Sequence, residues 1–190
     1  MPLKIIGTAL PDILLIEPEV YEDPRGFFLE TYHQKKYADA GIHPNFVQDN
    51  YSHSKRNTLR GLHYQLRYPQ AKLVYVITGE IFAGVVDIRR GSPTFGQWVG
   101  PQLTAETTLQ ILVPEGFAHG FCVLSDTADV IYKCTDFYVP DDDYGIFWAD
   151  PVIRIEWPVK IPLLSMKDKK NQKLTELGED FLPVYKNKKP

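Results

Sequence analysis

The sequence has few cysteines, no long apolar stretch and no marked excess of either charge. Its two cysteines, Cys122 and Cys134, lie in apolar, strand-like runs without Cys-x-x-Cys spacing. We therefore interpret them as small buried hydrophobic residues, and we expect neither a disulfide nor a zinc site. No window approaches the apolar length needed to cross a bilayer, and the first residues lack a charged region followed by a long apolar stretch. These features predict a soluble cytoplasmic protein.

Charge and length further limit which classes of protein the sequence fits. The 21 basic residues nearly balance the 24 acidic ones, and the longest basic cluster is the terminal Lys186 to Lys189. Because such a chain offers no extended basic surface, we expect no nucleic acid polymer as a partner. A length of 190 residues with 44% hydrophobic content suits one globular domain, residues 1–190, in which we expect a peripheral tail from about residue 171 to 190.

Short alternating or apolar runs separated by turn residues dominate the chain. We predict strands at Ile13 to Ile16, Gly26 to Glu30, Phe46 to Tyr51, Leu59 to Gln65, Leu73 to Thr78, Glu80 to Ile88, Gln97 to Leu103, Thr108 to Val113, Ala118 to Leu124 and Asp129 to Phe137. Helix is expected only around Gln34 to Ala40 and in a stretch after Ser165. Without alternating strands and helices, the pattern predicts an all-β sandwich or barrel.

Three polar side chains interrupt runs that otherwise read as buried strands. They are Arg60 and His63 in one run and Lys72 in the next. Burying a cation or an imidazole is costly unless it has a partner, so we predict a cavity that binds an anionic ligand between strands.

Strand parity predicts which of these side chains point inward, because alternate residues face opposite sides of a sheet. Tyr132 falls on an apolar face, and Lys72 shares its face with other apolar positions of its strand. That strand is apolar on both faces, so we expect a second sheet to cover one and a second subunit to cover the other. Arg60 and His63 would point to opposite sides, so both reach one ligand only if Gly61 hosts a bulge or bend.

The run from Pro114 to Gly120 carries His119 after a Pro-x-Gly turn and resembles the second half of a cupin metal motif. The first half would need two histidines and a glutamate, but its place here reads His63-Tyr64-Gln65 and then Lys72. A protonated lysine repels a divalent cation, and two histidines are too few ligands. We therefore predict no bound metal.

Ordered blocks through most of the chain resemble dTDP-4-dehydrorhamnose 3,5-epimerases. The blocks lie within residues 3 to 170 and are Asp23 to Glu30, Val47 to Asn50, Leu59 to His63, Gln70 to Val74, Gly91 to Gly96, Pro114 to Phe121, Tyr132 to Cys134 and Leu164 to Asp168. The resemblance implies a cupin-like jelly-roll homodimer without metal or cofactor. It also implies epimerisation of dTDP-4-keto-6-deoxy-D-glucose at carbons 3 and 5 through an enolate, in dTDP-L-rhamnose biosynthesis.

The resemblance also implies roles for four catalytic residues. His63 would be the base, Asp168 would orient its ring, Lys72 would stabilise the enolate oxygen, and Tyr132 would deliver a proton to the other side of the sugar ring. These residue types suit the chemistry, because a proton beside a ketone becomes removable when a base takes it and a donor stabilises the enolate.

The family's substrate-binding positions correspond to a larger set, part of which, including the region of Arg25 and Glu30, reaches the site across the dimer. The set is Arg25, Glu30, Gln48, Asn50, Arg60, His119 and Lys167 for the diphosphate and sugar, Tyr138 for stacking on thymine, and Asp143. Two departures bear on whether both carbons are epimerised. Asp143 stands where the family commonly has glutamate, and Ala83 stands where it often has aspartate.

Simpler interpretations remain for several positions. His63 could be a structural strand residue, Asp168 a helix cap after Ser165, Lys72 a side chain that reaches solvent, Tyr138 packing material and Arg25 a turn residue. Three functions are also open: the double epimerase, a single-carbon epimerase or keto-isomerase acting on a related nucleotide-linked sugar, and a non-catalytic binder of nucleotide sugars.

Overall fold

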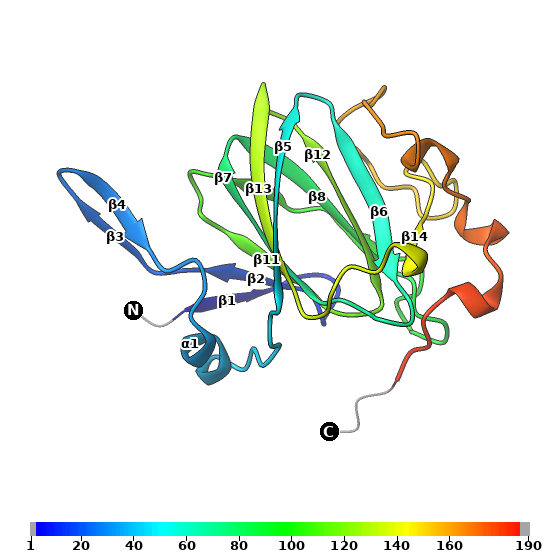
Figure 1. Cartoon of the computed structure of the whole chain (residues 1–190), viewed down its shortest axis with the longest axis horizontal. Helices are drawn as coiled ribbons and strands as arrows, with labels where there is room; N and C mark the ends of the chain where they lie inside the picture. Colours follow the sequence, from blue (N-terminus) through cyan, green and yellow to red (C-terminus); the bar gives the residue numbers. More distant parts are fainter. Residues whose placement is uncertain (1–2, 187–190) are drawn as a thin grey trace.

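Two six-stranded sheets, each open at both ends, face one another in the computed structural model, which describes residues 3–186 (Figure 1). The first sheet has the order β1-β2-β11-β7-β13-β5 and the second has the order β10-β8-β12-β6-β14, with β9 paired to β8. The first comprises β1 (Lys4–Gly7), β2 (Leu14–Glu17), β5 (Gln48–Lys55), β7 (Lys72–Thr78), β11 (Gln110–Val113) and β13 (Thr127–Cys134). The second comprises β6 (Leu59–Gln65), β8 (Glu80–Asp87), β9 (Trp98–Val99), β10 (Gln102–Thr104), β12 (Phe117–Val123) and β14 (Asp143–Gly145).

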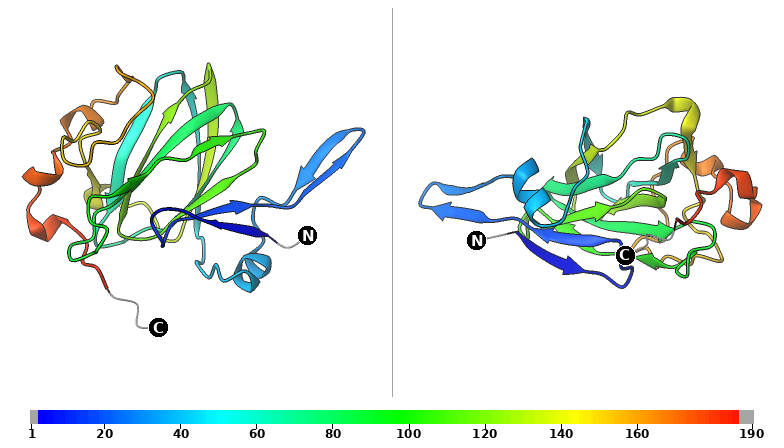
Figure 2. Two further views of the ribbon diagram at one scale, coloured as in Figure 1. Left: turned by 180° about the vertical axis from the view of Figure 1, so that it is seen from behind. Right: turned by 90° about the horizontal axis from the view of Figure 1, so that it is seen from below.

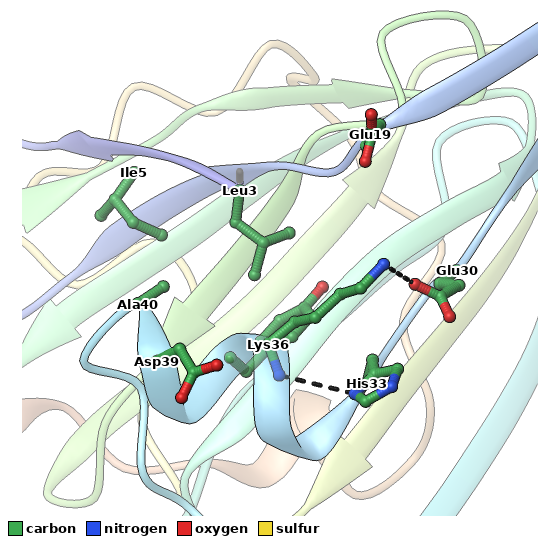
Figure 3. A pocket seen from close by; sticks show the side chains of 9 residues that line it. Leu3, Ile5, Glu19, Glu30, His33, Lys36, Asp39 and Ala40 are labelled. Carbon is green, nitrogen blue, oxygen red and sulfur yellow. Dashed lines mark hydrogen bonds and ion pairs between the residues drawn. The ribbon is translucent and has the colours of Figure 1, made fainter. Parts of the chain in front are cut away.

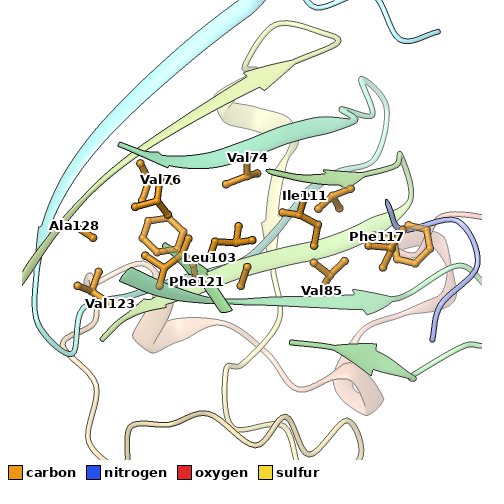
Figure 4. Packing of buried hydrophobic residues seen from close by; sticks show 14 of the residues in the cluster. Val74, Val76, Val85, Leu103, Ile111, Phe117, Phe121, Val123 and Ala128 are labelled. Atoms are coloured by element: carbon orange, nitrogen blue, oxygen red, sulfur yellow. The ribbon is translucent and has the colours of Figure 1, made fainter. Parts of the chain in front are cut away.

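Apolar side chains from the inner faces of both sheets form the main core. Val74 and Ile111 of the first sheet meet Val85, Leu103 and Phe121 of the second (Figure 4). All five are nearly or fully buried. The alternation that leaves one face of each strand apolar therefore determines which side chains enter the space between the sheets.

A separate hairpin extends away from the two sheets. It consists of β3 (Val20–Asp23) and β4 (Gly26–Leu29), and it projects at one end of the molecule (Figures 1 and 2). Two of its aromatic side chains are largely exposed to solvent: Phe27 is 63% exposed and Phe28 is 66% exposed. Contiguous exposed aromatic side chains mark surfaces that bind other molecules.

The helical segments are short. The helix α1 (Gln34–Asp39) follows the hairpin and buries Tyr37 against Leu73 and Ile16 of the first sheet. Three 3-10 turns, η2 (Asp168–Lys170), η3 (Leu174–Glu176) and η4 (Glu179–Phe181), lie at the end of the molecule opposite the hairpin (Figure 2), and η1 (Pro140–Asp142) precedes β14. Among residues 3–186, no helix is long and apolar enough to span a membrane.

The structure confirms the all-β prediction and corrects several segments. The strand expected over Gln97 to Leu103 is broken into β9 and β10 around Gly100 and Pro101. The prediction of a helix after Ser165 is wrong, because only the 3-10 turns η2 to η4 form there. Leu174 and Leu182 are instead buried against the second sheet, and these tertiary contacts outweigh local helix propensity. Both cysteines are buried free thiols, as predicted.

The short strands β1, β3 and β14 were missed by sequence reasoning. Their side chains are mostly partly or fully exposed, so the sequence shows no apolar face there. Each is defined by pairing with a neighbour, which local pattern cannot reveal.

Arg89 joins three distant parts of the chain. Its guanidinium forms 2.7 Å ion pairs with Asp12 and with the fully buried Asp87, and it lies 4.2 Å from the ring centroid of Phe117 and 5.0 Å from that of Tyr185. The cation thus ties a segment near each end of the chain to the second sheet.

We expect Arg89→Ala to lower the free energy of unfolding by about 3 kcal/mol, because it leaves the buried Asp87 carboxylate without its cation. Urea unfolding measures the change. Lys4→Ala is the control, since it breaks only the exposed pair with Glu17 and should leave the midpoint unchanged. Equal midpoints for the two variants would contradict the assignment.

Candidate active site

Two cavities of about 330 and 210 Å³ lie between the sheets and share four lining residues. The shared residues are His63, Lys72, Tyr132 and Asp143. His63 and Asp143 belong to the second sheet, whereas Lys72 and Tyr132 belong to the first. The imidazole and the phenol therefore reach the same space from opposite sheets.

His63 is paired with a buried carboxylate. Its Nε2 lies 2.5 Å from Oδ1 of Asp168, which is 3% exposed. Ser165 Oγ donates to the other carboxylate oxygen at 2.8 Å and also accepts from the Asp168 backbone N–H at 3.0 Å. Burial alone would raise the pKa of Asp168, but the hydrogen bonds from His63 and Ser165 outweigh it and lower that pKa below its usual range. The carboxylate is thus held ionised beside the ring.

A β-bulge at Gly61 lets Arg60 and His63 line the same cavity, as the sequence required. Between β6 and β12, His63 pairs with His119 whereas Arg60 pairs with Phe121, so the register shifts by one residue. Gly61 has φ of 124°, and a Cβ there would lie 2.5 Å from the Cα of Gly120. Only glycine fits this conformation and this close approach.

Lys72 and Tyr132 occupy neighbouring inward positions of β7 and β13. Tyr132 pairs with Val74, and Cys134 pairs with Lys72. Burial lowers the pKa of Lys72 and raises that of Tyr132. The ammonium therefore gives up a proton more readily than an exposed lysine does, while the phenol keeps its proton throughout the neutral range.

His119 is a buried histidine without a hydrogen bond to its Nε2. It lines the smaller cavity with Lys72 and His63. Burial, together with these two neighbouring basic groups, lowers its pKa from 6.5 to about 3. The ring is therefore neutral at physiological pH, with one polar atom unpaired in the cavity wall.

This histidine should make the protein acid-sensitive. In the unfolded chain it is protonated below about pH 6.5, whereas the folded ring resists protonation down to about pH 3. Stability should thus fall as pH drops from 6.5 toward 3, by up to about 1.4 kcal/mol per pH unit from this group. We expect His119→Leu to flatten that slope in urea unfolding at pH 7, 6 and 5. A slope as steep as that of the unmodified protein would contradict the prediction.

Tyr138, Asp143 and Lys167 form a polar network at the cavity rim. Tyr138 Oη donates to Asp143 Oδ2 at 3.0 Å, and Lys167 forms an ion pair with the same oxygen. The backbone N–H of Tyr138 donates to Gln48 Oε1 at 2.9 Å, and Gln48 in turn donates to Asn50 at 3.0 Å. Tyr138 is about half exposed, so part of its side chain is accessible from solvent.

Arg25 and Glu30 are the two expected site residues that their own chain does not bring to these cavities. Arg25 lies at the turn of the projecting hairpin, where its exposed side chain pairs with Asp23. Glu30 pairs with Lys36 beside a separate cavity of about 520 Å³ near α1 (Figure 3). All the other predicted site residues line one or both of the cavities between the sheets.

Sequence reasoning missed several lining residues. They are Tyr64, Gln65, Gln70, Gly120, Phe121 and Ser165. Strand alternation could have indicated one of them, because Gln65 lies two residues beyond His63 on the same strand and therefore faces the same side. Ala83 is instead fully buried in the apolar core and does not line either cavity.

The described residues, 3–186, contain no group of three or more His, Cys, Asp or Glu side chains arranged to hold a metal ion. The groups that line the cavities include the His63 imidazole with its Asp168 carboxylate, the Tyr132 phenol and the ammonium groups of Lys72 and Lys167. Such a set can remove a proton, stabilise negative charge and return a proton.

Comparison with known proteins gives one consistent result. The family model described as dTDP-4-dehydrorhamnose 3,5-epimerase matches residues 7–176. The chain is 53% identical to the dTDP-4-dehydrorhamnose 3,5-epimerase of Shigella flexneri, over 92% of this chain and 97% of that protein. It is 52% identical to the enzyme of the same name from Pseudomonas aeruginosa, over 90% and 95% of the two chains.

A solved structure agrees over nearly the whole chain. The 3,5-epimerase from Legionella pneumophila, crystallised in complex with dTDP-4-keto-L-rhamnose, superposes with a TM-score of 0.94 and 48% identity, covering 97% of this chain and 99% of that one. These matches place the protein among the carbohydrate epimerases, a class of isomerases. The chain belongs to the dTDP-4-dehydrorhamnose 3,5-epimerase family.

Proposed function

We propose that this protein epimerises dTDP-4-keto-6-deoxy-D-glucose at carbons 3 and 5, the step that leads toward dTDP-L-rhamnose. The observation that supports it most directly is a shared cavity with His63, backed by buried Asp168, on one sheet and Tyr132 on the other. Inverting a carbon requires a base on one side of the sugar ring and a proton donor on the other. The ligand bound to the relative from Legionella is a nucleotide-linked keto sugar of this type.

His63 removes the proton from a carbon beside the ketone. Asp168 holds the ring through Nε2 and stabilises the imidazolium that forms. Lys72 stabilises the enolate oxygen, and the partly buried setting strengthens that interaction. The ketone itself acidifies the neighbouring C–H bonds, so this route needs no metal and no cofactor.

Tyr132 returns a proton from the opposite side. Burial raises its pKa, so the phenol holds its proton at neutral pH, while the nearby Arg60 cation opposes part of that rise and favours the phenolate left after donation. Transfer to the enolate carbon completes the inversion. After His63 has released its proton and Tyr132 has regained one by exchange with solvent, the same steps at the second carbon give the double epimer.

The remaining cavity residues hold the nucleotide. Arg60 and Lys167 supply positive charge to the diphosphate, the neutral His119 ring supplies a hydrogen bond, and Gln48 and Asn50 bind sugar hydroxyls. The half-exposed ring of Tyr138 stacks on thymine, and Asp143 fixes both Tyr138 and Lys167.

The protein acts as a homodimer in which the hairpin of one subunit reaches the partner's site. Three observations support this: the hairpin projects (Figure 1), Phe27 and Phe28 are exposed on it, and Arg25 lies away from its own cavity. Arg25 and Glu30 then serve the neighbouring subunit's substrate. We further propose that the chain forms one jelly-roll domain of the cupin type and that the enzyme is cytoplasmic.

Subunit mixing tests whether Arg25 acts across the dimer. Arg25→Ala and His63→Ala should each be inactive alone. In a mixed dimer, one site combines an intact His63 with an intact Arg25 from the other chain. After unfolding and refolding the two variants together, we expect about a quarter of the unmodified activity, as random pairing predicts. Activity no higher than that of the separate variants would show that Arg25 acts within its own chain or not at all.

Deuterium labelling tests the reaction itself. Incubation with dTDP-4-keto-6-deoxy-D-glucose in heavy water should place deuterium at carbons 3 and 5, detected by NMR. Label at one carbon would instead select a single-carbon epimerase, the alternative raised by Asp143 and Ala83. The burial of Ala83 outside the cavity lining favours the double reaction. Label at neither carbon would favour a binder of nucleotide sugars.

A further inference from the structure

The segment that carries Tyr138 is held by glutamine side chains. It follows β13 and crosses the rim of the larger cavity, and Gln48, Gln65 and Gln70 all line that cavity. Four backbone groups in a row bond to these side chains: Asp136 O to Gln70 Nε2 at 2.8 Å, Phe137 O to Gln65 Nε2 at 3.1 Å, Tyr138 N to Gln48 Oε1 at 2.9 Å and Val139 N to Gln65 Oε1 at 2.8 Å.

Gln65 forms hydrogen bonds with this segment on both sides of Tyr138. It accepts from Val139 N and donates to Phe137 O, and its second N–H donates to Tyr68 O at 2.7 Å in the loop between β6 and β7. Both amide hydrogens are thus used, and the residue is only 5% exposed. Gln65 is therefore positioned to order the two loops at the rim, and it has no donor left for a ligand.

The position of Gln65 links this segment to the proposed base. Gln65 and His63 are two residues apart on β6, a spacing of about 7 Å along a strand, and both line the same cavity. One strand therefore sets the distance between the imidazole and the backbone of Tyr138. We propose that Gln65 is a positioning residue that fixes the Tyr138 ring as a platform for the nucleotide base, at a set distance from His63. This inference depends on the proposed function, because the platform is defined by the nucleotide substrate.

The variant Gln65→Met keeps the length of the side chain and removes all three hydrogen bonds. We expect KM for the nucleotide sugar to rise about tenfold, the loss expected when one stacked base loses its ordered platform, while kcat changes by less than about twofold. Affinity for dTDP should fall by the same factor, and affinity for pyrophosphate should be unchanged. In Gln65→Asn the amide is one methylene too short to reach both loops, so this variant should also raise KM with little change in kcat. It replaces the Met variant in the test if that variant does not fold.

A double variant separates positioning from general destabilisation. If Gln65 acts through the ring, Gln65→Met combined with Tyr138→Ala should bind dTDP no more weakly than Tyr138→Ala alone. Gln102→Met, at an exposed position of β10, is the matched control and should not alter KM. Additive losses in the double variant, weakened pyrophosphate binding, or a fall in kcat at constant KM would each overturn the inference. Deuterium labelling with the unmodified protein reports on the proposed function separately, so the two failures are distinguishable.

Discussion

The variant His63→Asn should lower kcat for epimerisation about a thousandfold, because it removes the group that we propose takes the proton from the sugar carbon. Deuterium should then enter carbons 3 and 5 at the same reduced rate, since exchange requires the same proton removal. Single-turnover NMR in heavy water measures both rates. Calorimetric titration with dTDP should show nearly unchanged affinity, because the nucleotide is held by other residues.

Two further variants sharpen this test. His53→Asn is the matched control, since His53 is exposed on β5 and pairs with Asp129, and it should retain full activity. Asp168→Asn should lower kcat about a hundredfold or more, because the amide no longer favours the imidazolium and can reverse the ring tautomer. If His63→Asn kept more than a tenth of the activity, the proposed base would be wrong.

The variant Tyr132→Phe should separate proton removal from inversion. It deletes the phenol oxygen that we propose as the proton donor and leaves His63 and Asp168 in place. We expect formation of the epimerised product to fall by about two to three orders of magnitude. Deuterium should still enter the recovered substrate, because protonated His63, with a side chain that is 30% exposed, exchanges with solvent and returns the label to the same face.

Mass spectrometry and NMR of the recovered sugar distinguish label from inversion. Tyr51→Phe is the control, since Tyr51 is 65% exposed and bonds to Asp129 outside the cavities. Equal loss of exchange and inversion in Tyr132→Phe would mean that the phenol is needed for proton removal itself. That outcome would contradict the assignment of Tyr132 to the opposite face.

The strands that could be predicted are those whose side chains alternate across a buried face. The prediction for Leu59 to Gln65 is confirmed at both ends, and that for Leu73 to Thr78 misses one residue. The same parity placed Tyr132 toward the interior, where it lines the cavity, and it required the bulge found at Gly61, but it left the direction of Lys72 open because both faces of that strand are apolar. These results follow from the two-residue period of a strand, which is a local property.

Contacts between distant residues lay outside the reach of such patterns. Gln65 bonds to groups 72 and 74 residues away in Phe137 and Val139, and Asp168 reaches His63 across 105 residues. The spacing from Ser165 to Asp168 left a helix cap open beside the role that the resemblance implied for Asp168; the serine does accept from that backbone N–H, and the carboxylate pairs with the imidazole. Local spacing cannot show which of two partners a side chain selects.

The amino-acid sequence by itself determined the all-β class, the inward direction of Tyr132 and, through its ordered motifs, the epimerase family. Only the tertiary structure decided that His63 and Tyr132 face one cavity from different sheets, that Arg25 lies away from it, and that Gln65 ties the rim together. The reason is physical: strand periodicity acts over a few residues, whereas a cavity is formed by packing between segments far apart in the chain.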